Sequence, residues 1–193
     1  SASVGGAVHI APPMALAAGY VAPDAGVFKR ALNLPIFVAG RINQPQIAEA
    51  ILTAGQADMC GMTRAMIADP EMPNKAARGA VDDIRACIGC NQACIGHFHR
   101  GLPVSCIQHP QTGRELTYGS LIPALVPKRV MVVGGGPAGM KAAATAAQRG
   151  HHVTLYEAGQ HLGGQALKAQ LLPGRAEFGG IVTNLTREME LAQ

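Results

Sequence analysis

A glycine-rich turn between an apolar run and an amphipathic segment constrains the fold of this chain more than any other feature. The pattern predicts a buried strand over 129–133, the turn GGGPAG over 134–139, and a helix over 138–149. A second strand is predicted over 152–156, with Glu157 at its tip. A strand, turn, helix and strand in this order indicate the opening of a doubly wound α/β domain.

Each glycine of this turn has a separate physical role in a dinucleotide-binding fingerprint. Gly134 permits the tight turn, Gly136 lets the backbone approach a pyrophosphate, and Gly139 lets the helix pack closely on the strand. Glu157 lies 18 positions after Gly139 and can accept hydrogen bonds from a ribose. The alternative is a structural turn with an ordinary surface glutamate, but strand, helix and acid all fall at the offsets of a nucleotide site.

A second glycine pair follows in HLGGQ, residues 161–165, and lets another backbone segment approach the same nucleotide. The order GGGPAG, YEA and LGGQ resembles the FAD-binding Rossmann domain of two-dinucleotide flavoproteins. A last helix is predicted over about 175–191. We therefore expect FAD rather than NAD in this site.

Four of the five cysteines fall within twenty residues. Such crowding predicts metal binding rather than disulfides, and three close thiolates with a more distant fourth suit a [4Fe–4S] cluster. A tetrahedral zinc site is the alternative, in which a histidine could replace a cysteine. Cys60 stands apart and is expected to be a small core residue. The candidate ligands are Cys87, Cys90, Cys94 and Cys106, with His97, His99 and His109 as possible substitutes.

The first half of the chain has a strand–helix–strand pattern. Strands are predicted over 35–39 and 57–61, and Asn43 can cap the intervening helix, which ends near residue 55. Gly40-Arg41 and Thr63-Arg64 would then follow two parallel strands of a TIM barrel, where phosphate sites are common. Arginines at such positions can also form structural ion pairs. A further short helix is predicted over 73–79.

Composition excludes several classes of protein. The net charge of +4 is modest and its cations are scattered, so we expect no nucleic-acid partner. No apolar run approaches the roughly 20 residues that cross a bilayer, and no secretory pattern opens the chain. A cytoplasmic location without membrane partners is the expectation. The initial serine suggests a piece of a longer chain.

Four motifs in order carry a family resemblance. They are PIFVAGRINQP, GMTRAMIADPEMPNK, CIGCNQACIGHFHRGLPVSC and RVMVVGGGPAGM. Together they resemble the iron–sulfur branch of the Old Yellow Enzyme superfamily, which includes 2,4-dienoyl-CoA reductase and trimethylamine, histamine and N-methylproline dehydrogenases or demethylases. The resemblance implies an α/β fold: residues 1–80 as the last βα units of an FMN-binding TIM barrel, residues 81–127 as an iron–sulfur loop and linker, and residues 128–193 as the start of an FAD-binding Rossmann domain.

The resemblance also assigns site residues. The FMN phosphate would be held by Gly40, Arg41, Thr63 and Arg64. The [4Fe–4S] cluster would be ligated by Cys87, Cys90, Cys94 and Cys106. FAD, or ADP in the amine dehydrogenases, would contact Gly134, Gly136, Ala138, Gly139, Glu157, Gly164 and Gln165. No catalytic side chain falls in this stretch.

The implied function is an NAD(P)H-dependent relay through FAD, the cluster and FMN that reduces an activated alkene on a small-molecule substrate. In amine-oxidising relatives the flow reverses, toward an external electron acceptor. Two other readings remain: a non-enzymatic module that binds zinc and a nucleotide, or a stretch that binds nothing because neither half-domain closes its core. This stretch alone is not expected to turn over.

Overall fold

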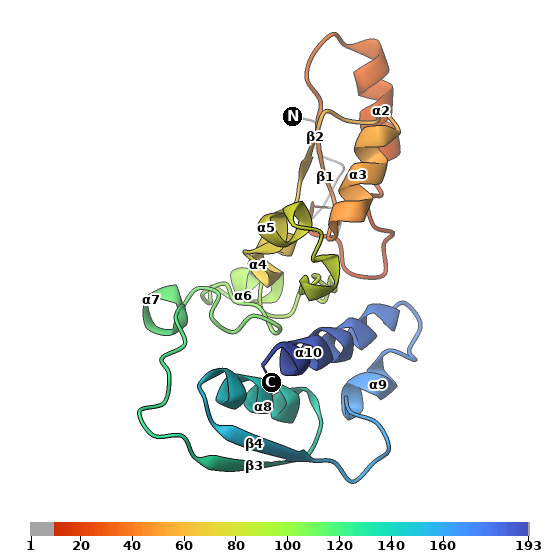
Figure 1. The fold of residues 1–193 in the computed structure, drawn as a ribbon. Helices are drawn as coiled ribbons and strands as arrows, with labels where there is room; N and C mark the ends of the chain where they lie inside the picture. Colours follow the sequence, from red (N-terminus) through yellow and green to blue (C-terminus); the bar gives the residue numbers. More distant parts are fainter. Residues whose placement is uncertain (1–9, 193) are drawn as a thin grey trace. The chain divides into compact units, whose positions relative to one another are not determined.

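The computed structural model describes residues 10–192, and the chain divides after Gly113 into two compact units (Figure 1). We call the described residues 10–113 the N-terminal unit and residues 114–192 the C-terminal unit. Each contains one two-stranded parallel sheet. The short helix α7 (Glu115–Tyr118) opens the C-terminal unit.

The N-terminal unit begins with the predicted alternation of helices and strands. Its elements are α2 (Ala22–Ala31), β1 (Phe37–Ala39), α3 (Pro45–Thr53) and β2 (Met59–Gly61). The strands pair in parallel, with Val38 opposite Cys60. Val38 and Ile51 anchor the small core, and Cys60 packs against it from a half-buried position. Helix α3 packs on the sheet because its apolar positions recur at helical spacing.

Thr63 and Arg64 follow β2, as predicted. They form the first turn of helix α4 (Thr63–Ala68), a helix that was not predicted. Helix α5 (Met72–Ala77) follows, close to the predicted range, and then a 3₁₀ turn over Val81–Asp83. The segment of the cysteines is irregular except for α6 (Ile95–His99). The residues from 63 to 84 form a second small core around Ala65, Met72 and Ile84.

The C-terminal unit follows the predicted order closely. Strands β3 (Arg129–Val133) and β4 (His152–Tyr156) pair in parallel, joined by helix α8 (Pro137–Gln148). Helix α9 (Gln165–Ala169), a 3₁₀ turn (Ala176–Phe178) and helix α10 (Gly179–Leu191) complete it. Helix α8 packs on the strands and α10 packs on α8 (Figure 1).

The sheet of the C-terminal unit is covered on one side. Met140 is fully buried in α8, and Leu185 of α10 is buried. Alternate strand residues, Met131, Val133 and Tyr156, are exposed. The strands therefore have one packed and one open face.

No helix in residues 10–192 has the length and apolar character that crossing a membrane requires.

Candidate cofactor sites

A cavity of about 220 Å³ lies where β1 and β2 of the N-terminal unit end. The carboxyl ends of parallel strands are the usual place for ligands in such folds. The loop that carries the cysteines, residues 87–106, also reaches the cavity; we call it the cysteine loop. Lining residues include all four predicted phosphate-site residues and three of the cysteine loop: Gly40, Arg41, Thr63, Arg64, Cys87, Gly89 and Ile95.

The turn after β1 has an unusual backbone. Arg41 adopts a left-handed conformation with φ of 53°, which is uncommon for a residue with a side chain, and is only 7% exposed. Gly40, at φ of 148°, has no room for a side chain, since a Cβ would lie 2.8 Å from Val21 Cγ2. A Cβ on Gly89 would likewise lie 2.7 Å from the Arg41 guanidinium. Strain of this kind clusters at functional sites.

Arg64 joins the start of α4 to two distant segments. Its Nη1 donates to the Pro12 carbonyl oxygen at 2.8 Å and to Asn91 Oδ1 at 2.6 Å. Part of the Arg64 guanidinium therefore holds the cysteine loop, and Arg64 forms no ion pair among residues 10–192.

Asn43 has a different role from the one expected of it. The residue that caps α3 is Gln44, without a side-chain hydrogen bond. The buried Asn43 instead donates from Nδ2 to the Cys87 carbonyl oxygen at 2.6 Å. Its Oδ1 is buried and accepts no hydrogen bond from the described residues. Because a carbonyl only accepts, this contact fixes the amide orientation and directs the acceptor elsewhere.

The cysteine thiols are free and half-buried. Burial raises the pKa of Cys87, while the Gly89 N–H and the Arg64 charge oppose that rise. Burial also raises the pKa of Cys90, to about 11. The thiols of Cys94 and Cys106 raise the pKa of both. The four sulfurs therefore share one electrostatic neighbourhood.

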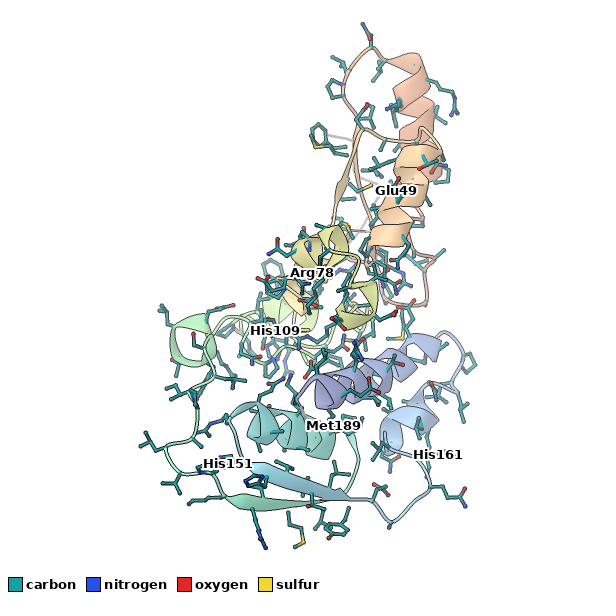
Figure 2. The ribbon with its side chains drawn as sticks, in the orientation of Figure 1. Glu49, Arg78, His109, His151, His161 and Met189 are labelled. Atoms are coloured by element: carbon teal, nitrogen blue, oxygen red, sulfur yellow. The ribbon has the colours of Figure 1, made fainter. Side chains whose placement is uncertain are left out.

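Within residues 10–192, no three His, Cys, Asp or Glu side chains are grouped closely enough to hold a metal ion. Two of the alternative zinc ligands have other contacts: Nδ1 of His97 lies 2.9 Å from the Pro103 carbonyl oxygen, and Nδ1 of His109 lies 3.1 Å from that of Ile67 (His109 is labelled in Figure 2).

The glycine-rich turn of the C-terminal unit has the geometry of its sequence pattern. Gly134 adopts a φ of 103°, open only to glycine at low cost. A Cβ on Gly139 would overlap the Gly134 carbonyl oxygen, whereas a Cβ on Gly136 would meet no atom within 4 Å. Gly139 is thus required by packing, and Gly136 leaves an open space at the N-terminus of α8. Unpaired N–H groups and the helix dipole favour an anion there.

Glu157 braces this turn. One carboxylate oxygen accepts from the Gly135 N–H at 2.6 Å, and the other accepts from the Gly159 N–H at 2.7 Å. The hydrogen bonds from Gly159 and then Gly135 hold the pKa of Glu157 below its usual value. The ribose contact remains a prediction, and it would use the lone pairs that these bonds leave.

The second glycine pair packs directly on the turn. The Gly163 N–H donates to the Gly135 carbonyl oxygen at 2.7 Å, and a Cβ on Gly164 would lie 3.1 Å from Gly136 Cα. Figure 2 labels His161, which opens this segment ahead of α9. Gln165 is the first residue of α9. The two glycine-rich segments therefore form one continuous backbone surface.

Fold and sites together define an α/β protein in which a segment of TIM barrel precedes a dinucleotide-binding Rossmann unit. Residues 2–83 match the NADH:flavin oxidoreductase / NADH oxidase family, and residues 132–187 match the NAD(P)-binding Rossmann-like domain. Residues 2–83 of the chain therefore belong to the NADH:flavin oxidoreductase / NADH oxidase family.

Known relatives are much longer than this chain. It is 48% identical over 151 residues to an NADH oxidase of Thermoanaerobacter brockii, and this alignment covers 78% of this chain and 23% of the relative. A 2-naphthoyl-CoA reductase complex superposes with a TM-score of 0.88 at 32% identity, over 94% of this chain and 28% of that one. Histamine dehydrogenase from Rhizobium sp. 4-9 gives 0.86 at 30% identity, over 93% and 27%. The chain spans less than a quarter of the length of this NADH oxidase and of a metal reductase of Desulforamulus reducens that it also resembles.

Proposed function

We propose that the protein containing this chain is an NAD(P)H-dependent iron–sulfur flavin oxidoreductase that reduces an activated alkene. The observation that carries the proposal is the cavity of about 220 Å³ that strand-end residues and the cysteine loop line together. A flavin phosphate in that cavity and a cluster on that loop would share a wall, formed by Cys87. This arrangement suits electron transfer between the two.

The hydrogen-bond donors that line the cavity suit the phosphate of FMN. Arginine binds phosphate through two parallel N–H groups, and the predicted phosphate site contains Arg41 and Arg64. The spare acceptor of Asn43 needs a donor, which the hydroxyl groups of a flavin side chain would provide. Gly40 and Thr63 would complete the phosphate contacts with backbone and hydroxyl groups.

The cysteine loop has a single C-x2-C pair, whereas zinc ribbons usually have two, and this spacing favours a [4Fe–4S] cluster over zinc. Cys94 and Cys106 both influence the pKa of Cys87 and of Cys90, which is consistent with four thiols that serve one centre. Binding must displace thiol protons, and the raised pKa of Cys90 makes that displacement costly at neutral pH. The positive charge of Arg64 beside Cys87 favours the thiolate that a cluster requires.

The C-terminal unit suits FAD. Gly136 leaves room for a pyrophosphate, Ala138 and Gly139 lie in the first turn of α8, and Gly164 closes over the turn. When bound, FAD, the cluster and FMN would supply the conversion of a hydride from NAD(P)H into single electrons. The residues of this chain would hold these cofactors, and they do not select the substrate.

An amine dehydrogenase or demethylase of the same family is the second candidate function. The likeness to histamine dehydrogenase is almost as close as the likeness to the naphthoyl-CoA reductase, which favours neither direction of electron flow. In that case the C-terminal unit would hold ADP, and electrons would leave the cluster for an external acceptor.

The full-length protein, purified without oxygen, tests the proposal. We expect about four iron and four sulfide per chain, with one FMN and one FAD. Cys90→Ser should lose the iron and keep both flavins, while the matched variant Cys60→Ser should keep all three. Zinc without sulfide would overturn the proposal in favour of a zinc- and nucleotide-binding module.

Substrate tests separate the two enzymatic candidates. NAD(P)H oxidation that depends on an enoyl-CoA supports alkene reduction, while reduction of an artificial acceptor by a secondary amine supports the alternative. The isolated stretch of 193 residues should oxidise no NAD(P)H in either assay.

A further inference from the structure

Asn91 occupies a special position inside the cysteine loop. It lies between Cys90 and Cys94 and adopts a left-handed backbone with φ of 56°. Asparagine is among the few residues with a side chain that tolerate this conformation. Its carbonyl oxygen accepts from the Gly96 N–H at 2.8 Å, which closes the turn that leads into α6.

The side-chain amide of Asn91 bridges two segments that are remote in the sequence. Its Oδ1 accepts from Arg64, 27 residues away, and its Nδ2 donates to the Ala11 carbonyl oxygen, 80 residues away, each at 2.6 Å. A guanidinium only donates and a carbonyl only accepts, so the two contacts fix the amide orientation. Asn91 is half-buried, so both bonds are partly shielded from water.

The earlier part of the cysteine loop is attached separately. The Met14 N–H donates to the Gly89 carbonyl oxygen at 2.9 Å, and Asn43 holds the Cys87 carbonyl. These contacts fix the loop up to residue 89. The side chain of Asn91 supplies the next attachment, at the start of the stretch between the second and third cysteines.

Arg64 faces both sites through this contact. Its guanidinium donates to Asn91, and Arg64 lines the cavity together with Cys87. An amide that holds the guanidinium therefore acts on the cysteine loop and on the cavity wall together.

We propose that Asn91 is a positioning residue that fastens the cysteine loop to Arg64 and Ala11, so that cluster retention and FMN binding both depend on this one amide. The inference rests on the proposed function, since it assumes a cluster on the loop and FMN in the cavity. Partners that orient metal ligands typically contribute roughly 10- to 100-fold to metal affinity.

Two variants separate the backbone of Asn91 from its amide. Asn91→Gly keeps access to the left-handed conformation and removes the amide, whereas Asn91→Asp keeps an acceptor for Arg64 and loses the donor to Ala11. Gln92→Ala is the matched control, because Gln92 is the exposed neighbour on the same turn. Iron release to a ferrous chelator, the electron paramagnetic resonance spectrum of the reduced cluster, and the FMN dissociation constant are measured on the full-length protein.

We expect Asn91→Gly to release iron roughly 10- to 100-fold faster than the parent protein and to bind FMN several-fold more weakly. The iron release rate and FMN affinity of Asn91→Asp should lie between those of Asn91→Gly and the parent protein, with a cluster spectrum closer to that of the parent. Gln92→Ala should match the parent in all three measurements. FAD content should stay constant in all variants, because its site is in the other unit.

If Asn91→Gly releases iron and binds FMN as the parent protein does, the inference is overturned, because the left-handed backbone alone would then be enough to position the cysteine loop. Faster iron release with unchanged FMN affinity would overturn the shared dependence. If Asn91→Gly fails to fold, Asn91→Asp provides the test. An iron release rate equal to that of the parent would then overturn the proposed positioning role of the amide. A parent protein without iron and sulfide would instead overturn the proposed function itself.

Discussion

The two candidate sites are built in opposite ways. In the C-terminal unit, the surface between residues 134 and 164 is mostly backbone, and its contacts join neighbouring stretches of chain. In the N-terminal unit, side chains join segments up to 80 residues apart, as Asn91 joins Ala11. A backbone site tolerates change at most side chains but almost none at its glycines. A side-chain site can be dismantled by single polar substitutions far from any ligand.

The largest effect that would test this contrast is expected from Asp69→Ala. Asp69 is 2% exposed and its carboxylate accepts from Lys75 Nζ at 2.6 Å and from the Arg85 N–H at 2.9 Å, just before the cysteine loop. Removing one partner of a buried ion pair costs about 3 kcal/mol. Backbone amides around residues 83–90 should then exchange with solvent roughly a hundredfold faster, as measured by hydrogen-exchange mass spectrometry.

The control for Asp69 is Asp82→Ala, because Asp82 is exposed in the neighbouring 3₁₀ turn. Its exchange rates should change by less than about threefold. Equal effects from the two substitutions, or faster exchange in the C-terminal unit with Asp69→Ala, would show that the side-chain contacts of Asp69 do not organise the chain around the cysteine loop.

Gly139→Ala should damage the other unit by a comparable or somewhat smaller amount. The added methyl group would overlap the Gly134 carbonyl oxygen, so helix α8 must shift away from the turn. Overpacking of this kind typically costs about 1–3 kcal/mol. Amide exchange should accelerate in residues 130–145 and not in the cysteine loop, and FAD content should fall. Normal exchange in this variant would mean that helix and turn are less closely packed than described.

Gly136→Ala sharpens the contrast, because it should affect binding without affecting the fold. Its Cβ would meet no atom within 4 Å, and its φ of −72° suits alanine. Amide exchange should match that of the parent protein, while FAD affinity should fall about tenfold, or about 1.4 kcal/mol. Calorimetric titration of the FAD-depleted protein measures this. Unchanged affinity would remove the assignment of the pyrophosphate to this space.

The smallest effect concerns pH. Backbone N–H groups of Gly159 and Gly135 lower the pKa of Glu157 in the folded state. A lowered folded-state pKa gives stability that is present above the ordinary pKa of 4.5 and is lost as pH falls through the lower folded value. Amide exchange at Gly135 should therefore accelerate slightly below pH 4.5, after correction for the intrinsic rate. In Glu157→Gln this acceleration should be absent; its persistence would assign the pH response to another group.

The sequence predicts the C-terminal unit well because its signals are local. Strands 129–133 and 152–156 have the expected bounds, and the conformations of Gly134 and Gly139 follow from the pattern alone. The βα order of the N-terminal unit is confirmed for the same reason. Family membership and the α/β fold also follow from the motifs.

The side-chain contacts that hold the cysteine loop in the N-terminal unit could not be predicted in this way. Asn43 has the position of a helix cap in the sequence, yet it donates to Cys87, 44 residues away. Nothing in the local pattern distinguishes Asn91 from any loop asparagine or shows that α4 begins at Thr63. These contacts depend on tertiary packing, and only the left-handed preference of asparagine offered a local signal at Asn91. The cofactor assignments of the site residues stay predictions.

The close approach of Gly89 to Arg41 has a consequence for how these proteins diverge. Any side chain at position 89 would occupy the space of the guanidinium and would also lie 3.1 Å from the Met14 backbone nitrogen. Homologues that keep the arginine should therefore keep the glycine, whereas loss of the arginine removes one of the obstacles and leaves the φ of 62° and the Met14 backbone as the others. An alignment of full-length homologues would reveal this as a pairwise constraint linking the barrel to the loop.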